Sequence, residues 1–74
     1  MNERLLNIFA DSFGLDSIDD ETSPEKVEEW DSLAHVGLMV ALEGEFGVSI
    51  SPSQAVDLSD VGRIRAFLSA QGVE

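Results

Sequence analysis

The side chain best placed for chemistry in this sequence is the hydroxyl of Ser32, within Trp30-Asp31-Ser32-Leu33. It stands at the start of the most apolar stretch of the chain, which is predicted to be a helix. The first turn of a helix offers free backbone N–H groups and the positive end of the helix dipole, and both favour an attached phosphate. Ser32 is therefore a candidate for phosphate ester formation. N-capping by Ser32 or by Asp31 is the ordinary structural alternative.

Ser32 does not have the surroundings of a catalytic nucleophile. The single histidine, His35, lies three residues further along the same predicted helix, and the chain has no Gly-x-Ser-x-Gly loop. We therefore expect no enzymatic activity, and we expect His35 to face solvent and Trp30 to serve in packing. Ser17 also follows an aspartate, but no apolar helix comes directly after it, so Ser32 is the better candidate.

The length and composition of the chain restrict the classes of function. Seventy-four residues are expected to form one domain over residues 1–74, too small to enclose a substrate. No Cys is present, and the acidic cluster at residues 16–21 lacks the glycine and terminal glutamate of an EF-hand loop, so no metal site is predicted. Neither a signal peptide nor a membrane-length apolar segment is recognisable, which favours a soluble cytoplasmic protein without membrane insertion.

The charge of the chain is strongly unbalanced. Fifteen acidic residues stand against four basic ones, for a formal net charge of −11. Nucleic acid is not an expected partner, because phosphate binding requires positive charge. Self-repulsion favours a monomer, and the negative charge favours association with basic protein surfaces.

Hydrophobic periodicity predicts an all-α fold, a bundle of three main helices and one short helix. The helices are expected over residues 2–13, over residues 32–46, from Ser51-Pro52-Ser53-Gln54 to about Val56, and from Ser59 or Asp60 to about Ala70. Residues 15–31 are predicted to be a loop, in which Pro24 could open a single helical turn. Apolar residues surround most of the 32–46 helix, which is therefore expected at the centre of the fold.

The run from Trp30 to Ile50 resembles the modification helix of acyl carrier proteins, through Asp-Ser-Leu at its start and Leu-Glu-x-Glu-Phe-Gly at its end. The segment Asp60-Val61-Gly62, with Ile64 and Phe67, is similar to the last helix of that family. The acidic loop after the first helix also matches in length and character. The resemblance spans nearly the whole chain in register, and it implies a small four-helix acyl-carrier-like bundle.

By this resemblance, Ser32 carries 4′-phosphopantetheine, transferred from coenzyme A by a Mg²⁺-dependent phosphopantetheinyl transferase, and Asp31 and Leu33 flank it in the attachment motif. The thiol of the arm would hold acyl groups as thioesters and pass them between enzymes of fatty-acid-like, polyketide-like or other specialised lipid biosynthesis. The implied partners are acyl-loading and acyl-transferring enzymes with basic docking patches. Candidates for lining an acyl pocket, which are also ordinary core residues, are Val36, Leu42, Phe46, Ile50 and Ile64.

The helix after Ser32 departs from the carriers of fatty acid synthases, which expose several carboxylates there to partner enzymes. The corresponding face is predicted to hold small residues within an arc of roughly 80°, namely Ala34, Gly37, Ala41 and Gly44. Asp31, Glu43 and Glu45 remain as acidic contacts for partners. Partner enzymes are therefore expected to approach closely without carboxylate-to-arginine pairing, in a specialised pathway. Drift on a tolerant surface is the alternative.

Two other functions stay open. An aminoacyl or peptidyl carrier, loaded by an adenylating enzyme, would also bear the arm on Ser32, although such carriers more often show Gly-Gly-x-Ser. An unmodified acidic helical adaptor would bind one basic partner and carry no arm. The cargo and the pathway are not predicted by the sequence.

Overall fold

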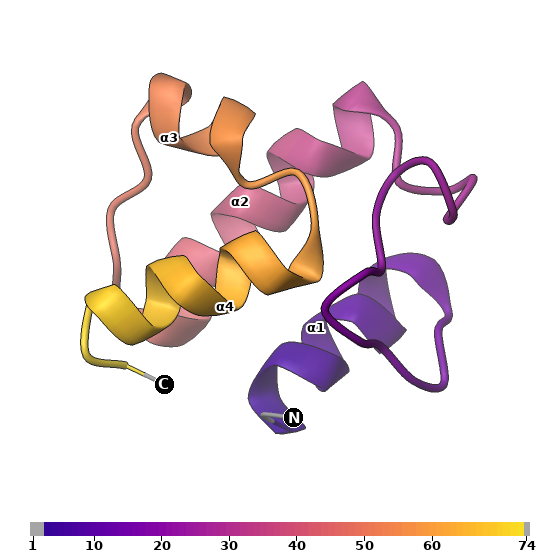
Figure 1. Ribbon diagram of the computed structural model, residues 1–74, viewed down its shortest axis with the longest axis horizontal. Coiled ribbons are helices and arrows are strands. Elements are labelled where there is room, and N and C mark those ends of the chain that lie inside the picture. The colour runs from indigo at the N-terminus through magenta and orange to yellow at the C-terminus, as the bar shows by residue number, and fades with distance from the viewer. Residues whose placement is uncertain (1–2, 74) are drawn as a thin grey trace.

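The computed structural model describes residues 3–73, and these residues form four α-helices without a strand (Figure 1). The helices are α1 (Glu3–Phe13), α2 (Ser32–Phe46), α3 (Pro52–Asp57) and α4 (Val61–Ala70). The predicted all-α architecture of three main helices and one short helix is therefore confirmed. The predicted start of the first helix at Asn2 lies outside the described residues.

Local capping signals account for most of the helix boundaries. Gly14 and Gly47 follow α1 and α2 with φ of +70° and +66°, a left-handed conformation that glycine adopts without steric cost. Ser51 and Gln54 form a reciprocal capping box at the start of α3. The Asp60 side chain accepts a hydrogen bond from the Arg63 N–H at the start of α4. These residues end and begin the helices where the sequence predicts.

The core lies between α1, α2 and α4. Each of these helices buries one row of apolar side chains, whereas α3 buries none of its own. The buried residues of the helices are Leu5, Ile8, Phe9 and Phe13 of α1, Leu38, Met39, Leu42 and Phe46 of α2, and Val61, Ile64 and Leu68 of α4. Val27, Trp30 and Leu58 complete the core from the connecting segments. The loops therefore supply part of the hydrophobic cluster that a chain of this length needs.

Helix α2 does not lie at the centre of the fold, and that prediction is wrong. One side of α2 is buried, but Leu33, Val36 and Val40 are 83%, 62% and 62% exposed on the other. Because apolar residues occur all around this helix, periodicity alone could not show which side would be covered. The protein thus presents an apolar helix face to solvent.

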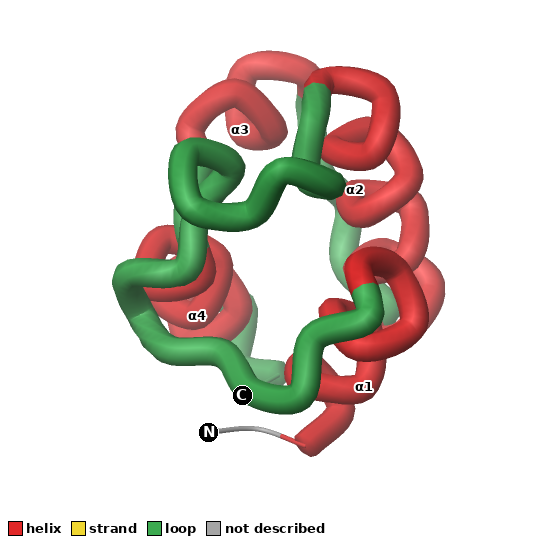
Figure 2. Tube along the Cα trace, turned by 90° about the vertical axis from the view of Figure 1, so that its right-hand side faces the viewer, coloured by secondary structure: helices red, strands yellow, loops and turns green. Residues whose placement is uncertain are grey.

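The loop over residues 14–31 is fastened to the start of α4. The N–H groups of Val61 and Gly62 donate to the carbonyl oxygens of Thr22 and Asp20, at 2.9 and 3.0 Å. Figure 2 shows this loop in green, passing the end of α4 on its way from α1 to α2. A side chain at Gly62 would place a Cβ 3.0 Å from the Asp20 carbonyl oxygen, so glycine permits this close approach. The free amides in the first turn of α4 thereby hold the loop in place.

Residues 24–26 of this loop form a hydrogen-bonded turn, in which the N–H groups of Lys26 and Val27 donate to the Ser23 carbonyl at 3.0 and 2.9 Å, so the single helical turn expected at Pro24 is present. Across residues 3–73, no helix is long and apolar enough to cross a membrane.

Candidate functional site

At the start of α2, the helix is capped by Asp31 and not by the hydroxyl of Ser32. Asp31 is the N-cap: its backbone is extended, and its carboxylate accepts a hydrogen bond of 2.8 Å from the Ala34 N–H. Ser32 is the first residue of the helix and is exposed. Among the described residues, the Ser32 hydroxyl has no hydrogen-bond partner. Asp31, and not Ser32, therefore caps α2, and the Ser32 hydroxyl is exposed.

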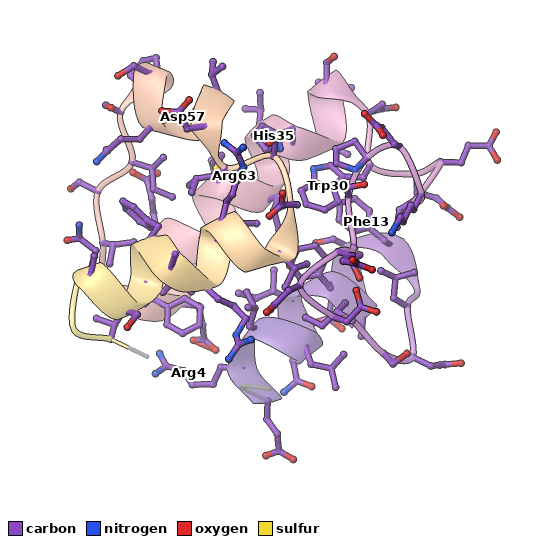
Figure 3. All side chains as sticks on the ribbon, viewed as in Figure 1. Arg4, Phe13, Trp30, His35, Asp57 and Arg63 are labelled. Atoms are coloured by element: carbon purple, nitrogen blue, oxygen red, sulfur yellow. The ribbon has the colours of Figure 1, made fainter. Side chains whose placement is uncertain are left out.

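Trp30 anchors the segment that precedes Ser32. Its side chain is 1% exposed, and its ring lies 5.3 Å from the ring of Phe9 and 5.7 Å from that of Phe13, measured between centroids. Figure 3 shows Trp30 on the loop side of α2, close to Phe13 of α1 and His35 of α2. Aromatic packing of this kind buries a large apolar area. The predicted packing role of Trp30 is confirmed.

His35 joins Trp30 to α3. The Trp30 indole N–H donates to Nδ1 of His35 at 2.9 Å, and Nε2 of His35 lies 2.8 Å from the carbonyl oxygen of Ala55. Because Nδ1 accepts from the indole, the ring is neutral, with its proton on Nε2 and donated to Ala55. His35 is half-buried, so the expectation of a solvent-facing histidine is wrong. The side chain connects the loop, α2 and α3.

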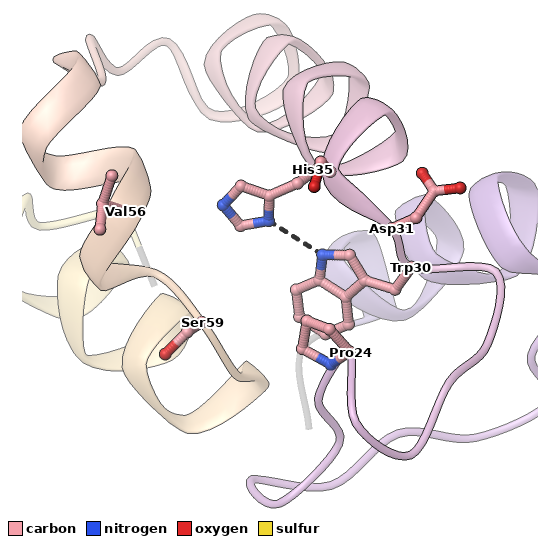
Figure 4. A pocket seen from close by; sticks show the side chains of 7 residues that line it. Pro24, Trp30, Asp31, His35, Val56 and Ser59 are labelled. Carbon is pink, nitrogen blue, oxygen red and sulfur yellow. Dashed lines mark hydrogen bonds between the residues drawn. The ribbon is translucent and has the colours of Figure 1, made fainter.

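A hollow of about 470 Å³ opens beside Ser32 (Figure 4). Pro24 and Trp30 lie on its loop side, His35 lies between the two sides, and Val56 and Ser59 face them from the segment around α3. Asp31 and Ser32 complete the lining. The volume falls within the range of small-molecule pockets, and the lining combines apolar groups with a few polar ones.

Sequence reasoning missed Pro24, Val56 and Ser59 as lining residues of the hollow. They lie at least eight positions from Ser32, and no motif connects them to it. Their approach depends on the His35–Ala55 hydrogen bond and on the loop contacts with α4. Short-range sequence patterns carry no signal for such contacts.

The predicted acyl-pocket residues lie elsewhere. Leu42, Phe46 and Ile64 are buried in the core, and Ile50 is half-buried against it. Val36 does not share this interior, because its side chain lies on the exposed face of α2. None of the five lines the hollow beside Ser32.

The predicted small-residue face divides in two. Ala34 and Ala41 are half-buried and pack against the core, which corrects their assignment to the exposed face. Gly37 and Gly44 are exposed, and a Cβ at either position would meet nothing within 4 Å. Apart from Ser32 and Glu45, the exposed residues of α2 are Leu33, Val36, Gly37, Val40 and Gly44, and we call these five the outer face of α2. Compared with the predicted stripe of small residues, this face is rotated about the helix axis toward Leu33, Val36 and Val40.

The three acidic residues of α2 and its cap all make contacts within the chain. Asp31 caps the helix, and the Glu43 carboxylate accepts a hydrogen bond of 2.9 Å from the Ile50 N–H. Glu45 lies 3.7 Å from the guanidinium of Arg4, which also covers the ring of Phe46 at 4.6 Å. Glu43 and Glu45 therefore hold the end of α2, and Glu45 does so while remaining exposed.

Comparison with known protein families gives a match over most of the chain. A family model described as the phosphopantetheine attachment site matches residues 3–68. This range contains α1, α2 and α3 completely, most of α4, and the segment Asp31-Ser32-Leu33. No curated protein is significantly similar to the chain.

Replacing His35 tests the connection between Trp30 and α3. His35→Phe keeps a ring of similar shape but leaves the indole N–H and the Ala55 carbonyl without their partner. We expect a loss of about 1–3 kcal/mol in the free energy of unfolding, the cost of leaving partly buried polar groups unpaired. Urea unfolding followed by the fluorescence of Trp30, the single tryptophan of the chain, measures it. Equal stability of the two proteins would show that this bridge contributes nothing.

Proposed function

The chain belongs to the family of phosphopantetheine-binding carrier proteins, and we propose that it is an acyl carrier that bears its arm on Ser32. Domains of this family are the sites of covalent 4′-phosphopantetheine attachment, and they act as carriers that interact with phosphopantetheinyl transferases and partner enzymes. The proposal adds the residue, the class of cargo and the character of the docking surface.

The observation that carries the proposal is the state of the Ser32 hydroxyl. It is exposed at the first position of α2, and Asp31 supplies the cap that a serine there would otherwise provide. The remaining free N–H groups of the first turn and the helix dipole favour a phosphodiester at this point. The residues present therefore fit the group that the family carries.

Attachment requires one substitution at phosphorus. The Ser32 oxygen forms a bond to the phosphorus of the pantetheine phosphate in coenzyme A, and the bond from that phosphorus to the bridging oxygen of the diphosphate breaks. Adenosine 3′,5′-bisphosphate leaves, and the hydroxyl proton passes to a base of the transferase. The chain itself supplies the acceptor hydroxyl and its fixed position. When bound, the arm supplies a thiol that holds the cargo as a thioester.

The attachment motif favours acyl cargo over amino acids. Asp31-Ser32-Leu33 resembles the motif of acyl carriers, whereas peptidyl carriers more often show Gly-Gly-x-Ser. An apolar interior lies behind the motif, and Leu42, Phe46, Ile50 and Ile64 are its candidates for sheltering an acyl chain. An aminoacyl carrier would use the same serine, so it is the second candidate.

Partner enzymes are proposed to meet the outer face of α2 through apolar contacts. Leu33, Val36 and Val40 are exposed along this face, and Gly37 and Gly44 leave space beside them. A partner that covers these side chains gains the free energy of burying apolar surface, about 25 cal/mol per Å². The net charge of −11 would act at longer range, by steering the carrier toward basic surfaces. Such docking suits a specialised lipid or polyketide pathway in the cytoplasm, served by a monomeric carrier.

Substitution of Ser32 tests the attachment directly. After incubation with coenzyme A, Mg²⁺ and a phosphopantetheinyl transferase, the unchanged protein should gain the mass of one phosphopantetheine group. Ser32→Ala should gain none, and it should fold normally because Asp31 provides the cap. Ser17→Ala is the matched control, since Ser17 also follows an aspartate, and it should be modified fully. A mass gain in Ser32→Ala would contradict the proposal.

Charges placed on the outer face of α2 test the docking proposal. Gly37→Glu/Gly44→Glu should lower kcat/KM for acyl delivery to the native partner enzyme by about tenfold, or ~1.4 kcal/mol, because carboxylates would be desolvated against apolar surface. Gly37→Ala/Gly44→Ala is the control, since both positions have open space for a Cβ and alanine adds no charge. Equal turnover by the glutamate variant and the control would contradict apolar docking.

A further inference from the structure

The proposed function assigns no role to the hollow beside Ser32. Its position is informative, because Ser32 is itself one of its lining residues. Any group attached to the Ser32 oxygen therefore begins at the rim of the hollow. The predicted acyl-pocket residues do not line it. The hollow thus lies next to the root of the arm and is separate from the buried interior.

The root of the arm, which is the end attached to Ser32, differs in chemistry from the tip, which bears the thiol. The unit that follows the phosphate bears two methyl groups on a quaternary carbon, then a hydroxyl and an amide, whereas the thiol and its cargo lie at the opposite end. A pocket at the root is therefore presented first with a compact apolar group and two polar ones. It need not accommodate the acyl chain.

The lining of the hollow has matching properties. Pro24 and Val56 supply exposed apolar walls, with Val56 77% exposed, whereas Trp30 is 1% exposed and backs the hollow from the core. The Ser59 hydroxyl is exposed, and within residues 3–73 it has no hydrogen-bond partner. It can donate to an amide carbonyl or exchange a hydrogen bond with a hydroxyl. The side chains thus offer apolar contact and one free hydrogen-bonding group.

The walls of the hollow are also fixed before anything enters it. Both nitrogens of His35 are occupied, one by the Trp30 indole and the other by the Ala55 carbonyl, which belongs to the residue preceding Val56. His35 thereby connects the loop side to the α3 side, and Figure 4 shows its hydrogen bond to Trp30. A pocket held open in this way binds at a lower entropic cost than one that must be ordered by its occupant.

We propose that this hollow holds the dimethyl-bearing unit of the phosphopantetheine arm, with Pro24 and Val56 in contact with its methyl groups and Ser59 in hydrogen-bonding range of its polar part. The inference rests on the proposed attachment at Ser32. It assigns Val56 and Ser59 as positioning residues for the arm. The proximal half of the arm is then restrained against the protein, and only the distal half with the thiol reaches toward partner enzymes.

Isotope-filtered nuclear Overhauser measurements on the modified protein without cargo test this contact. The protein is labelled with ¹³C and ¹⁵N, and the arm comes from unlabelled coenzyme A. Cross-peaks are expected from the two arm methyl groups to the ring protons of Pro24 and the methyl groups of Val56. Cross-peaks from these methyls to Leu33 and Val36 instead, or to no protein proton, would overturn the inference.

Matched valine variants make the test specific to the hollow. Val56→Ser should lose the cross-peaks between the arm methyls and Pro24, because it removes the apolar wall opposite the proline. Val40→Ser should retain them, since Val40 is an exposed helical valine that does not line the hollow. Retention of the cross-peaks in both variants, or their loss in both, would overturn the role of Val56.

Intact mass, measured on each sample before the spectra, distinguishes this inference from the proposed function. A full mass gain without the expected cross-peaks contradicts binding of the arm in the hollow, but it agrees with attachment at Ser32. No mass gain in the unchanged protein contradicts attachment, and the inference that rests on it falls as well.

Discussion

The hydrogen bond from the Trp30 indole to His35 connects the end of the loop to the start of α2 and, through His35, to α3. Its donor is packed against Phe9 and Phe13 of α1, and its acceptor stands on the first turns of α2. The second nitrogen of His35 then reaches the Ala55 carbonyl of α3. A single neutral imidazole thus fixes the end of the loop, the start of α2 and the position of α3 relative to one another. The two sides of the hollow beside Ser32 depend on that arrangement.

The start of α2 has two tasks that compete for the same atoms. A helix needs a side-chain oxygen to satisfy its first N–H groups, and an attachment site needs a hydroxyl that is free of such duties. Asp31 and Ser32 divide these tasks, since the carboxylate caps and the hydroxyl stays exposed. The remaining acidic side chains of α2 also have structural roles, because Glu43 and Glu45 hold neighbouring segments. The outer face of α2 is left to apolar and small residues.

The helices could be predicted from the sequence because their ends depend on residues close in the chain. Gly14, Gly47 and the Ser51–Gln54 box act within one turn of the boundary that they set. Ser32 was identifiable for the same reason, from its neighbours and from the apolar helix behind it. The hollow and the role of His35 depend instead on contacts with Ala55, twenty positions away. No local pattern encodes them.

Hydrophobic periodicity also could not predict which side of α2 is buried. A helix with apolar residues on every side has no preferred inward face, so the choice is made by its neighbours in the fold. Here α1 and the core take the side with Leu38, Met39 and Leu42, and Leu33, Val36 and Val40 are left outside. Ala34 and Ala41 turn inward with the buried side. The exposed surface of α2 is therefore mainly an apolar stripe, where the sequence predicts a stripe of small residues.

Tandem mass spectrometry of the unsubstituted protein after transferase treatment tests the central claim most directly, since it locates the arm without altering the chain. Digestion should yield one modified peptide, the one that contains Ser32, and fragmentation should place the phosphopantetheine group on that residue alone. Assignment of the group to Ser17 or to any other serine would contradict the account.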